Sequence, residues 1–519
     1  MAVGRGTSAV NGATAPEAEP LAAGSAPATD PPLQLSIRLG RQLEEAGVPY
    51  CHWKSTMAIE RSISGENDVD LLVEATQARR FTELLSGLGF VRAYRSGQEV
   101  PGIESFYGFD AEADRLVHVH AHYKLVVGDD RTKNYRLPIE SSYIGSARPG
   151  TVFRLPAAEF EYVALVIRLV LKYCTWDEIG WRALRGQRAR PKSSESAEFA
   201  DLSARADPRR VHSVLEECLP GLEPRLFSDC LEALSAEASV GSRVMAARRL
   251  EIALQPYARR SRRADRALRI GRRIALALNR RRHRASRGRL IAGGTIIGVI
   301  GGDGAGKSTA LAVLESWLGS EFDVRLVHLG RPPWSATTYA IRAGLKGADM
   351  VARLLARAIP VASVQRSSRR VSAFRPLVWL VCVARDRSLA YRRAHRFALG
   401  GGVVLCDRYP HPQLVSMDVP RIPTMPGGKS ETWIVKKMVE LEKRYHCAIL
   451  PPDLLVVLRV DPKIAAARKT EENPESVQRR GAEIWNVDWA GLGVDVVDAG
   501  QSQDAVALEL KALVWSALG

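Results

Sequence analysis

The feature that most constrains the fold is a glycine-rich segment that lies between a strand pattern and a helix pattern. Residues 295–300 read Thr-Ile-Ile-Gly-Val-Ile, and they run directly into Gly-Gly-Asp-Gly-Ala-Gly-Lys-Ser at 301–308. The residues from 307 to 318 then place leucines on one helical face. A strand, a glycine turn and a helix in this order form the opening unit of many α/β sheets.

Strand and helix patterns continue to alternate through the C-terminal region. Apolar runs predict strands at 324–329, 403–406 and 454–460, with helical stretches between them. This alternation predicts an α/β fold in which helices cover both faces of a parallel sheet. The apolar runs Leu377–Ala384 and Ile291–Ile300 are too short to cross a membrane, and they suit buried strands.

The segment 301–308 matches the pattern G-x-x-x-x-G-K-[ST], in which each fixed residue type serves phosphate binding. Glycines let the backbone curl so that successive N–H groups point at phosphate oxygens. Lys307 places a positive charge beside the β- and γ-phosphates, and Ser308 offers its hydroxyl to Mg²⁺. We therefore expect ATP or another nucleoside triphosphate, with Mg²⁺, to bind Gly301, Gly302, Asp303, Gly304, Ala305, Gly306, Lys307, Ser308 and Thr309.

Three later segments follow this loop in order. Val-Cys-Val-Ala-Arg-Asp-Arg ends at Arg387, and Gly-Val-Val-Leu-Cys-Asp-Arg-Tyr ends at Tyr409. Pro-Asp-Leu-Leu-Val-Val-Leu-Arg-Val-Asp-Pro ends at Pro462. Together with the loop, these segments resemble thymidylate kinase and its relatives among the nucleoside-monophosphate kinases. The resemblance covers the chain from Ile296 to the C-terminus.

The resemblance implies a P-loop kinase over residues 293–519, with ATP as donor and Mg²⁺ as cofactor. It places Asp303 beside the metal and the transferred phosphate, Arg408 on the acceptor's phosphate and Arg387 in the acceptor pocket. Asp407 ends an apolar strand, where a carboxylate can hold Mg²⁺ through water. We expect these three residues of the donor side, Asp303, Asp407 and Lys307, to act in catalysis together with Arg408. The lid that closes cations over the triphosphate corresponds to Arg468, Lys469, Arg479 and Arg480.

The chain departs from the thymidylate kinase pattern where the acceptor's nucleoside would bind. Leu-Gly-Arg-Pro-Pro at 329–333 has no acidic residue, and Pro-His-Pro-Gln follows Tyr409. The expected acceptor is therefore another small phosphorylated or hydroxylic molecule, a nucleoside monophosphate or a sugar-type compound. The alternative is a nucleotide-dependent binding or scaffold protein with a degenerate kinase site. Arg387 and Arg408 favour the kinase, because a switch has no use for a second phosphate site.

The N-terminal region shows a different mixture of patterns. Helices are expected at 35–46 and 75–88, and strands at 68–73 and 116–127. These patterns predict an α+β domain over residues 33–145. Helical spacing then dominates, which predicts a helical domain over 146–256.

A pair of carboxylates begins the first of these strands. Asp68 and Asp70 are two residues apart, so their side chains face the same way and can bind one or two Mg²⁺ ions. This D-x-D, with Trp-Lys-Ser at 53–55, resembles the motif of nucleotidyltransferase domains. The resemblance rests on this short motif and extends over residues 33–145.

The strand at 116–127 carries histidines where such an enzyme normally has a third carboxylate. His118, His120 and His122 lie on one face at period two. Three imidazoles in this arrangement can bind a transition metal or contact a substrate phosphate. The alternative is a polar strand face in a degenerate domain that binds without turnover.

The net charge of +17 is concentrated in one segment. Residues 257–290 contain fourteen arginines and one aspartate, a local charge of +13, which leaves +4 for the rest of the chain. This segment predicts an arginine-rich linker helix over 257–292, and peripheral attraction to an anionic membrane through 257–290 is the second reading. Nucleic acid is not an expected partner, because the remainder is nearly neutral and few aromatic residues are available for stacking.

Other features of the whole chain give expectations about its class. Residues 1–32 have almost no large apolar side chains, which predicts disorder. The seven cysteines form no CxxC pair, which argues against a disulfide framework and a structural zinc site. No secretory signal is visible at the N-terminus, so a cytoplasmic protein is expected. A homodimer is compatible with the sequence, which does not determine the oligomeric state.

Overall fold

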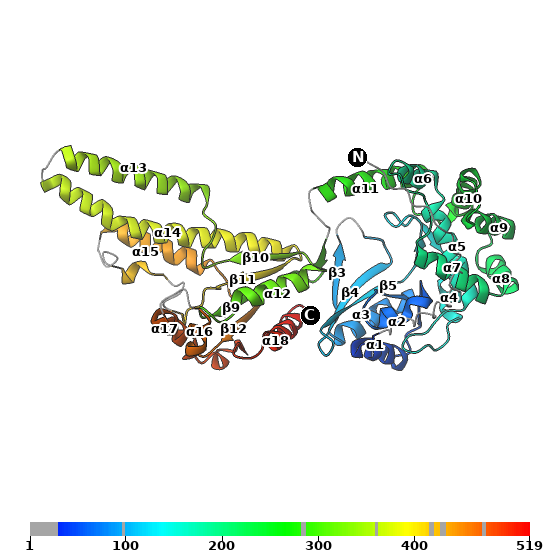
Figure 1. Ribbon diagram of the computed structural model, residues 1–519, viewed down its shortest axis with the longest axis horizontal. Helices are drawn as coiled ribbons and strands as arrows, with labels where there is room; N and C mark the ends of the chain where they lie inside the picture. Colours follow the sequence, from blue (N-terminus) through cyan, green and yellow to red (C-terminus); the bar gives the residue numbers. More distant parts are fainter. Residues whose placement is uncertain are drawn as a thin grey trace, which may run out of the picture.

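The computed structural model describes residues 30–95, 99–281, 287–358, 362–414, 420–425, 432–469 and 474–519. Within these residues the fold is mixed α/β and has two main sheets, one mixed and one parallel. Figure 1 shows two lobes, with the N-terminal lobe on the right and the C-terminal lobe on the left. Of the segment 1–32, for which disorder is expected, residues 1–29 lie outside the described residues.

The N-terminal lobe is built on a six-stranded sheet in the order β1-β2-β5-β4-β3-β8. Strands β2 and β5 pair in parallel, and the other neighbours pair antiparallel. The buried sides of helices α1 and α3 pack on this sheet in one hydrophobic core. The elements are α1 (Gln34–Glu45), β1 (Tyr50–His52), α2 (Ile59–Ile63), β2 (Val69–Val73), α3 (Ala78–Gly87), β3 (Val91–Arg95), β4 (Ile103–Asp110), β5 (Arg115–His122) and β8 (Gly288–Leu290).

A helical domain extends the N-terminal lobe. Its centre is α5 (Ala158–Tyr173), which is apolar over most of its circumference and is buried by the helices around it. The surrounding elements are the hairpin β6 (Leu125–Val127) and β7 (Tyr135–Leu137), and the helices α4 (Glu140–Gly145), α6 (Trp176–Ala183), α7 (Ser193–Arg205), α8 (Pro208–Cys218), α9 (Pro224–Leu234) and α10 (Val240–Ala253).

The C-terminal lobe contains a five-stranded parallel sheet in the order β10-β11-β9-β12-β13. All six residues of the central strand β9 are buried, because helices α12 and α18 cover one face and α14 covers the other. The elements are β9 (Ile296–Gly301), α12 (Lys307–Gly319), β10 (Val324–His328), α13 (Ala336–Ala358), α14 (Ala362–Leu399), β11 (Val403–Asp407), α15 (Trp433–Cys447), β12 (Leu454–Arg459), α16 (Pro462–Arg468), α17 (Pro474–Trp485), β13 (Asp495–Asp498) and α18 (Gln503–Ser516).

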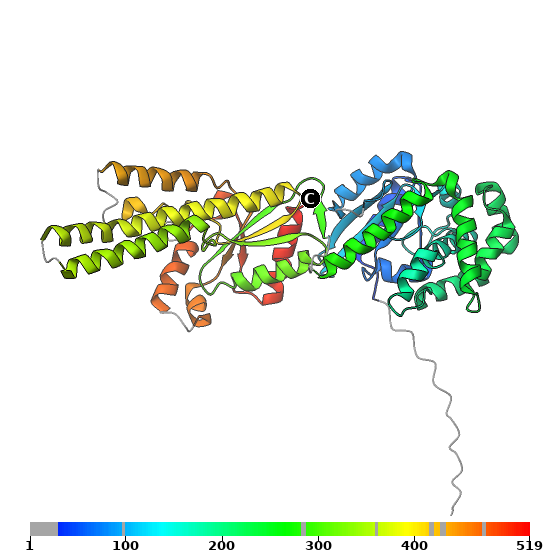
Figure 2. The same ribbon diagram turned by 90° about the horizontal axis from the view of Figure 1, so that it is seen from above.

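Two long helices extend the C-terminal lobe beyond its sheet. Helices α13 and α14 form an antiparallel pair that projects away from the N-terminal lobe, as Figures 1 and 2 show from two directions. No helix among the described residues is both long enough and apolar enough to cross a membrane.

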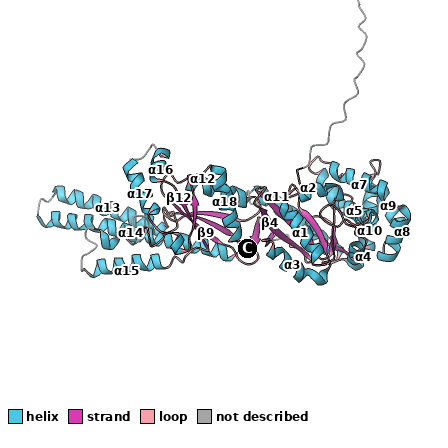
Figure 3. Ribbon diagram, turned by 90° about the horizontal axis from the view of Figure 1, so that it is seen from below, coloured by secondary structure: helices cyan, strands magenta, loops and turns pink. Residues whose placement is uncertain are grey.

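The two lobes share a hydrophobic core. Strand β8 lies in the middle of the chain but pairs with β3 of the N-terminal sheet. Phe322 and Trp515 of the C-terminal lobe pack in the same core as Tyr107 of β4. Lys511 in α18 also lies 2.6 Å from Asp114 of the N-terminal lobe. Figure 3 shows α18 and the C-terminus between the two sheets.

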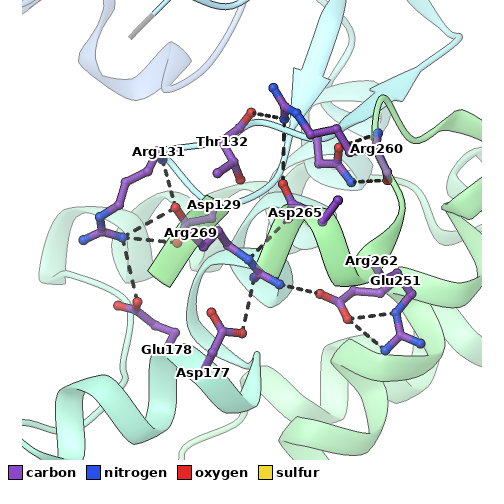
Figure 4. A network of polar contacts seen from close by, with 12 residues as sticks. Asp129, Arg131, Thr132, Asp177, Glu178, Glu251, Arg260, Arg262, Asp265 and Arg269 are labelled. Atoms are coloured by element: carbon purple, nitrogen blue, oxygen red, sulfur yellow. Dashed lines mark hydrogen bonds and ion pairs between the residues drawn. The ribbon is translucent and has the colours of Figure 1, made fainter. Parts of the chain in front are cut away.

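Helix α11 (Arg262–Arg281) lies against the helical domain and buries two of its arginines. Figure 4 shows Arg269 among three carboxylates, which belong to Asp177, Glu251 and Asp265, at 3.1 to 3.5 Å. Arg273 contacts three as well: Asp129 and Asp177 at 3.1 Å and Glu178 at 2.6 Å.

The opposite side of α11 is apolar and faces solvent. Ile270, Ile274 and Leu278 are 38%, 49% and 51% exposed. A simple linker helix would expose its charges to solvent. Helix α11 differs, because the side that faces the helical domain carries buried ion pairs. Attraction to an anionic membrane stays a prediction, and the exposed apolar stripe is the surface that would carry it.

Several predicted elements need correction. Leu377–Ala384 is part of helix α14 and not a strand. The expected strand at 116–127 is divided into β5 and β6, and residues 288–290, expected within the arginine-rich helix, form β8. The run Ile291–Ile300 is a strand only from Ile296 onward, because β9 is Ile296–Gly301. The remaining predicted strands and helices of both lobes are present, with ends that differ by at most three residues.

Candidate functional site

The glycine-rich loop lies at the carboxyl end of the central strand of the parallel sheet. Strand β9 ends at Gly301, and α12 begins at Lys307. Gly304 and Gly306 have φ angles of +85° and +82°, which other residues rarely adopt. A Cβ atom on Gly304 would lie 2.4 Å from the carbonyl oxygen of Ala465, so this position also lacks space for a side chain. The loop therefore curls tightly into the N-terminus of α12.

Lys307 directs its ammonium group into this loop. Its Nζ donates a 2.7 Å hydrogen bond to the carbonyl oxygen of Gly302, and the side chain is buried. Burial, together with the nearby charge of Arg408, lowers the pKa of Lys307 to about 8, although Asp303 and Asp407 oppose this shift. A positive charge held in a buried loop is suited to binding an anion.

Asp303 is buried and bridges two arginines from distant parts of the chain. Its Oδ1 accepts a 2.7 Å hydrogen bond from Nη2 of Arg408, and its Oδ2 lies 3.1 Å from Nη1 of Arg480. Arg408 has a φ angle of +56°, in the left-handed region that long side chains seldom adopt. Strained backbone of this kind is concentrated at ligand-binding and catalytic positions.

Asp407 is the last residue of β11 and lies beside the loop, because β11 pairs in parallel with β9. Its Oδ1 is buried and has no hydrogen-bond partner among the described residues. Its Oδ2 lies 3.6 Å from Nε2 of His328, its direct neighbour in strand register. Ser308 is exposed in the first turn of α12. A carboxylate oxygen with no partner among the described residues and an exposed hydroxyl at the glycine-rich loop fit Mg²⁺, which prefers oxygen ligands and retains water.

The expected acceptor residue Arg387 lies on α14 at the same edge of the sheet. It is buried, and its Nε donates a 2.8 Å hydrogen bond to the carbonyl oxygen of Leu329, just after β10. The preceding residue, Asp386, has a structural role. Its carboxylate accepts hydrogen bonds from the amide and hydroxyl of Ser335 and the hydroxyl of Thr338, and so holds the start of α13 on α14.

The expected lid residues are divided by the structure. Arg480 reaches Asp303, and the charge of Lys469 is close enough to affect Lys307. Arg468 instead donates a 3.0 Å hydrogen bond to the carbonyl oxygen of Ala499, and Arg479 is exposed. Of these residues, Arg480 is the one that contacts a residue of the loop, and the assignment of Arg468 and Arg479 to the triphosphate stays a prediction.

The N-terminal lobe brings its carboxylates and histidines together. Strands β2 and β5 pair in parallel with Asp70 opposite His120, so both sets of side chains lie on one face. Nδ1 of His118 lies 2.8 Å from Oδ1 of Asp68, and Nε2 of His122 lies 3.0 Å from Oδ1 of Asp70. Nδ1 of His120 lies between the two acids, 3.8 Å from Asp68 and 3.6 Å from Asp70.

Lys54 neutralises one of these acids. Its Nζ lies 2.6 Å from Oδ1 of Asp70 and 3.4 Å from Nε2 of His122. Burial alone would raise the pKa of Asp70, but Lys54 and the neighbouring histidines hold it well below its usual value. Burial, with the charge of Lys54, lowers the pKa of His122 well below its usual value, so this ring is neutral at pH 7.

A strained turn places Lys54 in this cluster. Lys54 and Ser55 have φ angles of +68° and +53°. The backbone amide and hydroxyl of Ser55 donate to the carboxylate of Glu198, and those of Thr56 donate to Glu161. The helical domain therefore fixes the turn, and with it the ammonium group beside Asp70.

No family model matches this chain, and a search of the curated proteins gives no match. Both resemblances therefore rest on the motifs and on the geometry described above. The two sites are separate, because one lies on the parallel sheet and the other on the mixed sheet.

Sequence reasoning did not find His328 or Lys133. His328 ends β10 next to Asp407, and a signal existed, since strands at 324–329 and 403–406 were expected in one parallel sheet. Lys133 follows the hairpin strand β6, and burial with the charge of Lys54 lowers its pKa to about 8. The sequence shows no pattern that connects Lys133 with Asp70, because the two residues are far apart in the chain and a loop brings Lys133 close to Asp70.

Proposed function

We propose that the C-terminal lobe is a P-loop kinase that resembles thymidylate kinase. It binds ATP with Mg²⁺ at residues 301–309 and transfers the γ-phosphate to a small phosphorylated or hydroxylic acceptor. The observation that carries this proposal is the convergence of the curled loop, Lys307 and the Asp303–Arg408 pair at the carboxyl ends of β9 and β11. Ligands of open parallel sheets bind at such edges, where the strand order changes direction.

The residues present suit phosphoryl transfer. The loop amides and Lys307 would bind the phosphates of the donor, and the N-terminus of α12 would favour their negative charge. Ser308 and Asp407 would hold Mg²⁺, which when bound neutralises charge on the β- and γ-oxygens. Arg408, now paired with Asp303, would contact the phosphate of the acceptor. Positioning and charge neutralisation of this kind account for most of the catalysis in phosphoryl transfer.

The resemblance would place the acceptor beside Arg387 and the segment after Tyr409, at the carboxyl ends of the strands. A buried arginine is suited to bidentate binding of phosphate. The proposed acceptor is therefore the one expected from the sequence, a nucleoside monophosphate or a sugar-type molecule.

The experiment is a transfer assay on the full chain with ATP, Mg²⁺ and a panel of nucleoside monophosphates, sugars and sugar phosphates. Mass spectrometry should show that one acceptor class gains one phosphoryl group, about 80 Da. Lys307→Ala should abolish turnover, whereas Lys437→Ala, which removes an exposed lysine paired with Glu440 on α15, should not change it. Transfer by Lys307→Ala at the wild-type rate would contradict the donor-site assignment.

A nucleotide-dependent scaffold with a degenerate kinase site is the second candidate. In the wild-type assay it would bind ATP·Mg without transferring phosphate to any acceptor. The buried Arg387 and the Arg408 guanidinium at the loop favour the kinase. For a kinase, Arg408→Ala should raise the KM for the acceptor more than tenfold and that for ATP much less.

A further inference from the structure

The N-terminal lobe contains a ligand set that the proposed kinase reaction does not use. Asp68, His118 and His120 each offer one ligand atom, and these atoms lie within 4.8 Å of one another. Asp70, His120 and His122 form a second group with the same property. Both groups occur on the face shared by β2 and β5.

The spacing of the first group fits a single metal ion. Metal–ligand bonds of about 2.0–2.2 Å place neighbouring ligand atoms about 2.9–3.6 Å apart. Nδ1 of His118 lies 2.8 Å from Oδ1 of Asp68, and Nδ1 of His120 lies 3.8 Å from Oδ2 of the same carboxylate. An ion between these atoms therefore requires only small side-chain movements.

The second group already holds a cation. The ammonium of Lys54 lies 2.6 Å from Oδ1 of Asp70 and 3.4 Å from Nε2 of His122, where an ion shared by these two residues would sit. Because the positive charge of Lys54 compensates Asp70, the group formed by Asp68, His118 and His120 is the one left to bind a metal.

The donor atoms decide the class of metal. Two of the three ligands are imidazole nitrogens, which suit Zn²⁺ and other first-row transition metals, whereas Mg²⁺ prefers oxygen. The ring of Tyr107 stacks on His118 at a centroid distance of 4.1 Å and fixes its orientation. Asp68 is half exposed, so solvent or a substrate can reach the remaining coordination positions.

We propose that Asp68, His118 and His120 bind one divalent transition-metal ion of the zinc type. Three protein ligands with access to solvent describe an open site, which leaves a position for water or for an oxygen of a substrate. This site replaces the binding of one or two Mg²⁺ ions by Asp68 and Asp70 that the D-x-D motif predicts. It is independent of the kinase site in the C-terminal lobe.

The test is metal binding by the purified full chain. After chelation and dialysis, the protein is titrated with Co²⁺, whose visible d–d absorption changes when protein ligands replace water, and Zn²⁺ is used to displace it. The wild type should bind one equivalent. Asp68→Asn and His118→Ala should each weaken binding at least tenfold. His212→Ala should not, because His212 is an exposed residue of α8 that pairs with Glu216.

Asp68→Asn is the main variant, because the exposed carboxylate can be changed to an amide of the same shape without disturbing the core. Circular dichroism and unchanged ATP turnover show that the variants are folded. Absence of Co²⁺ binding by the wild type at micromolar concentration would overturn the proposal, and so would wild-type affinity in Asp68→Asn. Uptake of a second equivalent of Co²⁺ that is lost in His122→Ala would overturn the inference that Lys54 occupies the second group. Lys307→Ala should keep its metal, so failure of the kinase proposal is distinguishable from failure of this one.

Discussion

Lys307 combines two properties that lead to a testable pH dependence. Its ammonium group is buried, and burial with the charge of Arg408 lowers its pKa to about 8. A bound triphosphate would favour the charged form and raise this pKa. The affinity for ATP·Mg should therefore be highest below pH 8. Above pH 8 it should fall by up to about tenfold for each pH unit.

Calorimetry at pH 7.5 to 9.5 measures this effect directly. At pH 8 in the wild type, binding should take up about half a proton, seen as a dependence of the heat on the buffer's ionisation enthalpy. Lys307→Arg provides the control, because arginine stays charged and the affinity should lose its slope over this range. A wild-type affinity that is constant up to pH 9.5 would show that the lysine charge is not used.

Substitution of two glycines of the loop can distinguish the effect of backbone strain from the effect of steric crowding. Both have positive φ angles, but only at Gly304 would a Cβ atom meet the backbone, 2.4 Å from the oxygen of Ala465. Gly306→Ala should destabilise the unliganded protein by about 1–2 kcal/mol, because alanine is strained in the left-handed conformation. Gly304→Ala should destabilise it more, because α16 must also move. Thermal unfolding without nucleotide measures the difference, and equal losses would contradict the crowding at Gly304.

The site residues also show how far a motif can locate a side chain. The loop pattern placed Lys307 and Asp303 correctly at one strand end, since loop, strand and helix are contiguous in sequence. The lid illustrates the opposite case. Neighbouring helical residues point about 100° apart, so the motif does not show which of Arg479 and Arg480 faces the loop, whereas the structure shows Arg480 in contact with Asp303.

At the scale of elements, α11 depends on ion pairs that the sequence presents only as excess charge. Arg273 has a side chain 1% exposed and contacts Asp129, Asp177 and Glu178. Removing one partner of a buried ion pair leaves uncompensated charge in a poorly solvated environment. Arg273→Ala should therefore destabilise the N-terminal lobe by about 3–5 kcal/mol.

Arg263→Ala is the matched control on the same helix. Arg263 is exposed, so its loss should change stability by less than about 0.5 kcal/mol. Thermal unfolding followed by circular dichroism compares the two variants. Equal midpoints would mean that the arginines of α11 act as a solvated charged surface, as a simple linker helix would.

Elements were predicted correctly where the local sequence pattern determines them. They were missed where an apolar run was ambiguous or where pairing with a distant segment decides the structure. The helix pattern after the loop and the strand at 403–406 match α12 and β11 closely. Leu377–Ala384 is an apolar run whose length does not distinguish a buried strand from part of a long helix. The three residues of β8 carry no local strand signal, because the pairing with β3 connects positions almost 200 residues apart.

At the scale of the whole molecule, the lobes are joined by a core that neither forms alone. Phe322 is fully buried and contacts Tyr107 of the N-terminal lobe, with ring centroids 5.0 Å apart, and Trp515 of its own lobe. Arg95 and Glu321 add an ion pair of 2.7 Å across the same boundary. A boundary with this composition resembles the interior of a domain more than a contact between independent units.

The shared core predicts that the lobes unfold together. Calorimetry of the full chain should show one main transition, and Phe322→Ala should lower the midpoint of all of it, because truncating a buried Phe costs about 3–5 kcal/mol. Trp433→Ala, at a position 76% exposed, should leave the midpoint unchanged. ATP·Mg binds only the C-terminal lobe in our proposal, yet by mass action it should raise the midpoint of the whole transition. The result that contradicts this prediction is two separate transitions, only one of which is shifted by Phe322→Ala or by ATP·Mg. That result would show that each lobe is stable without the other.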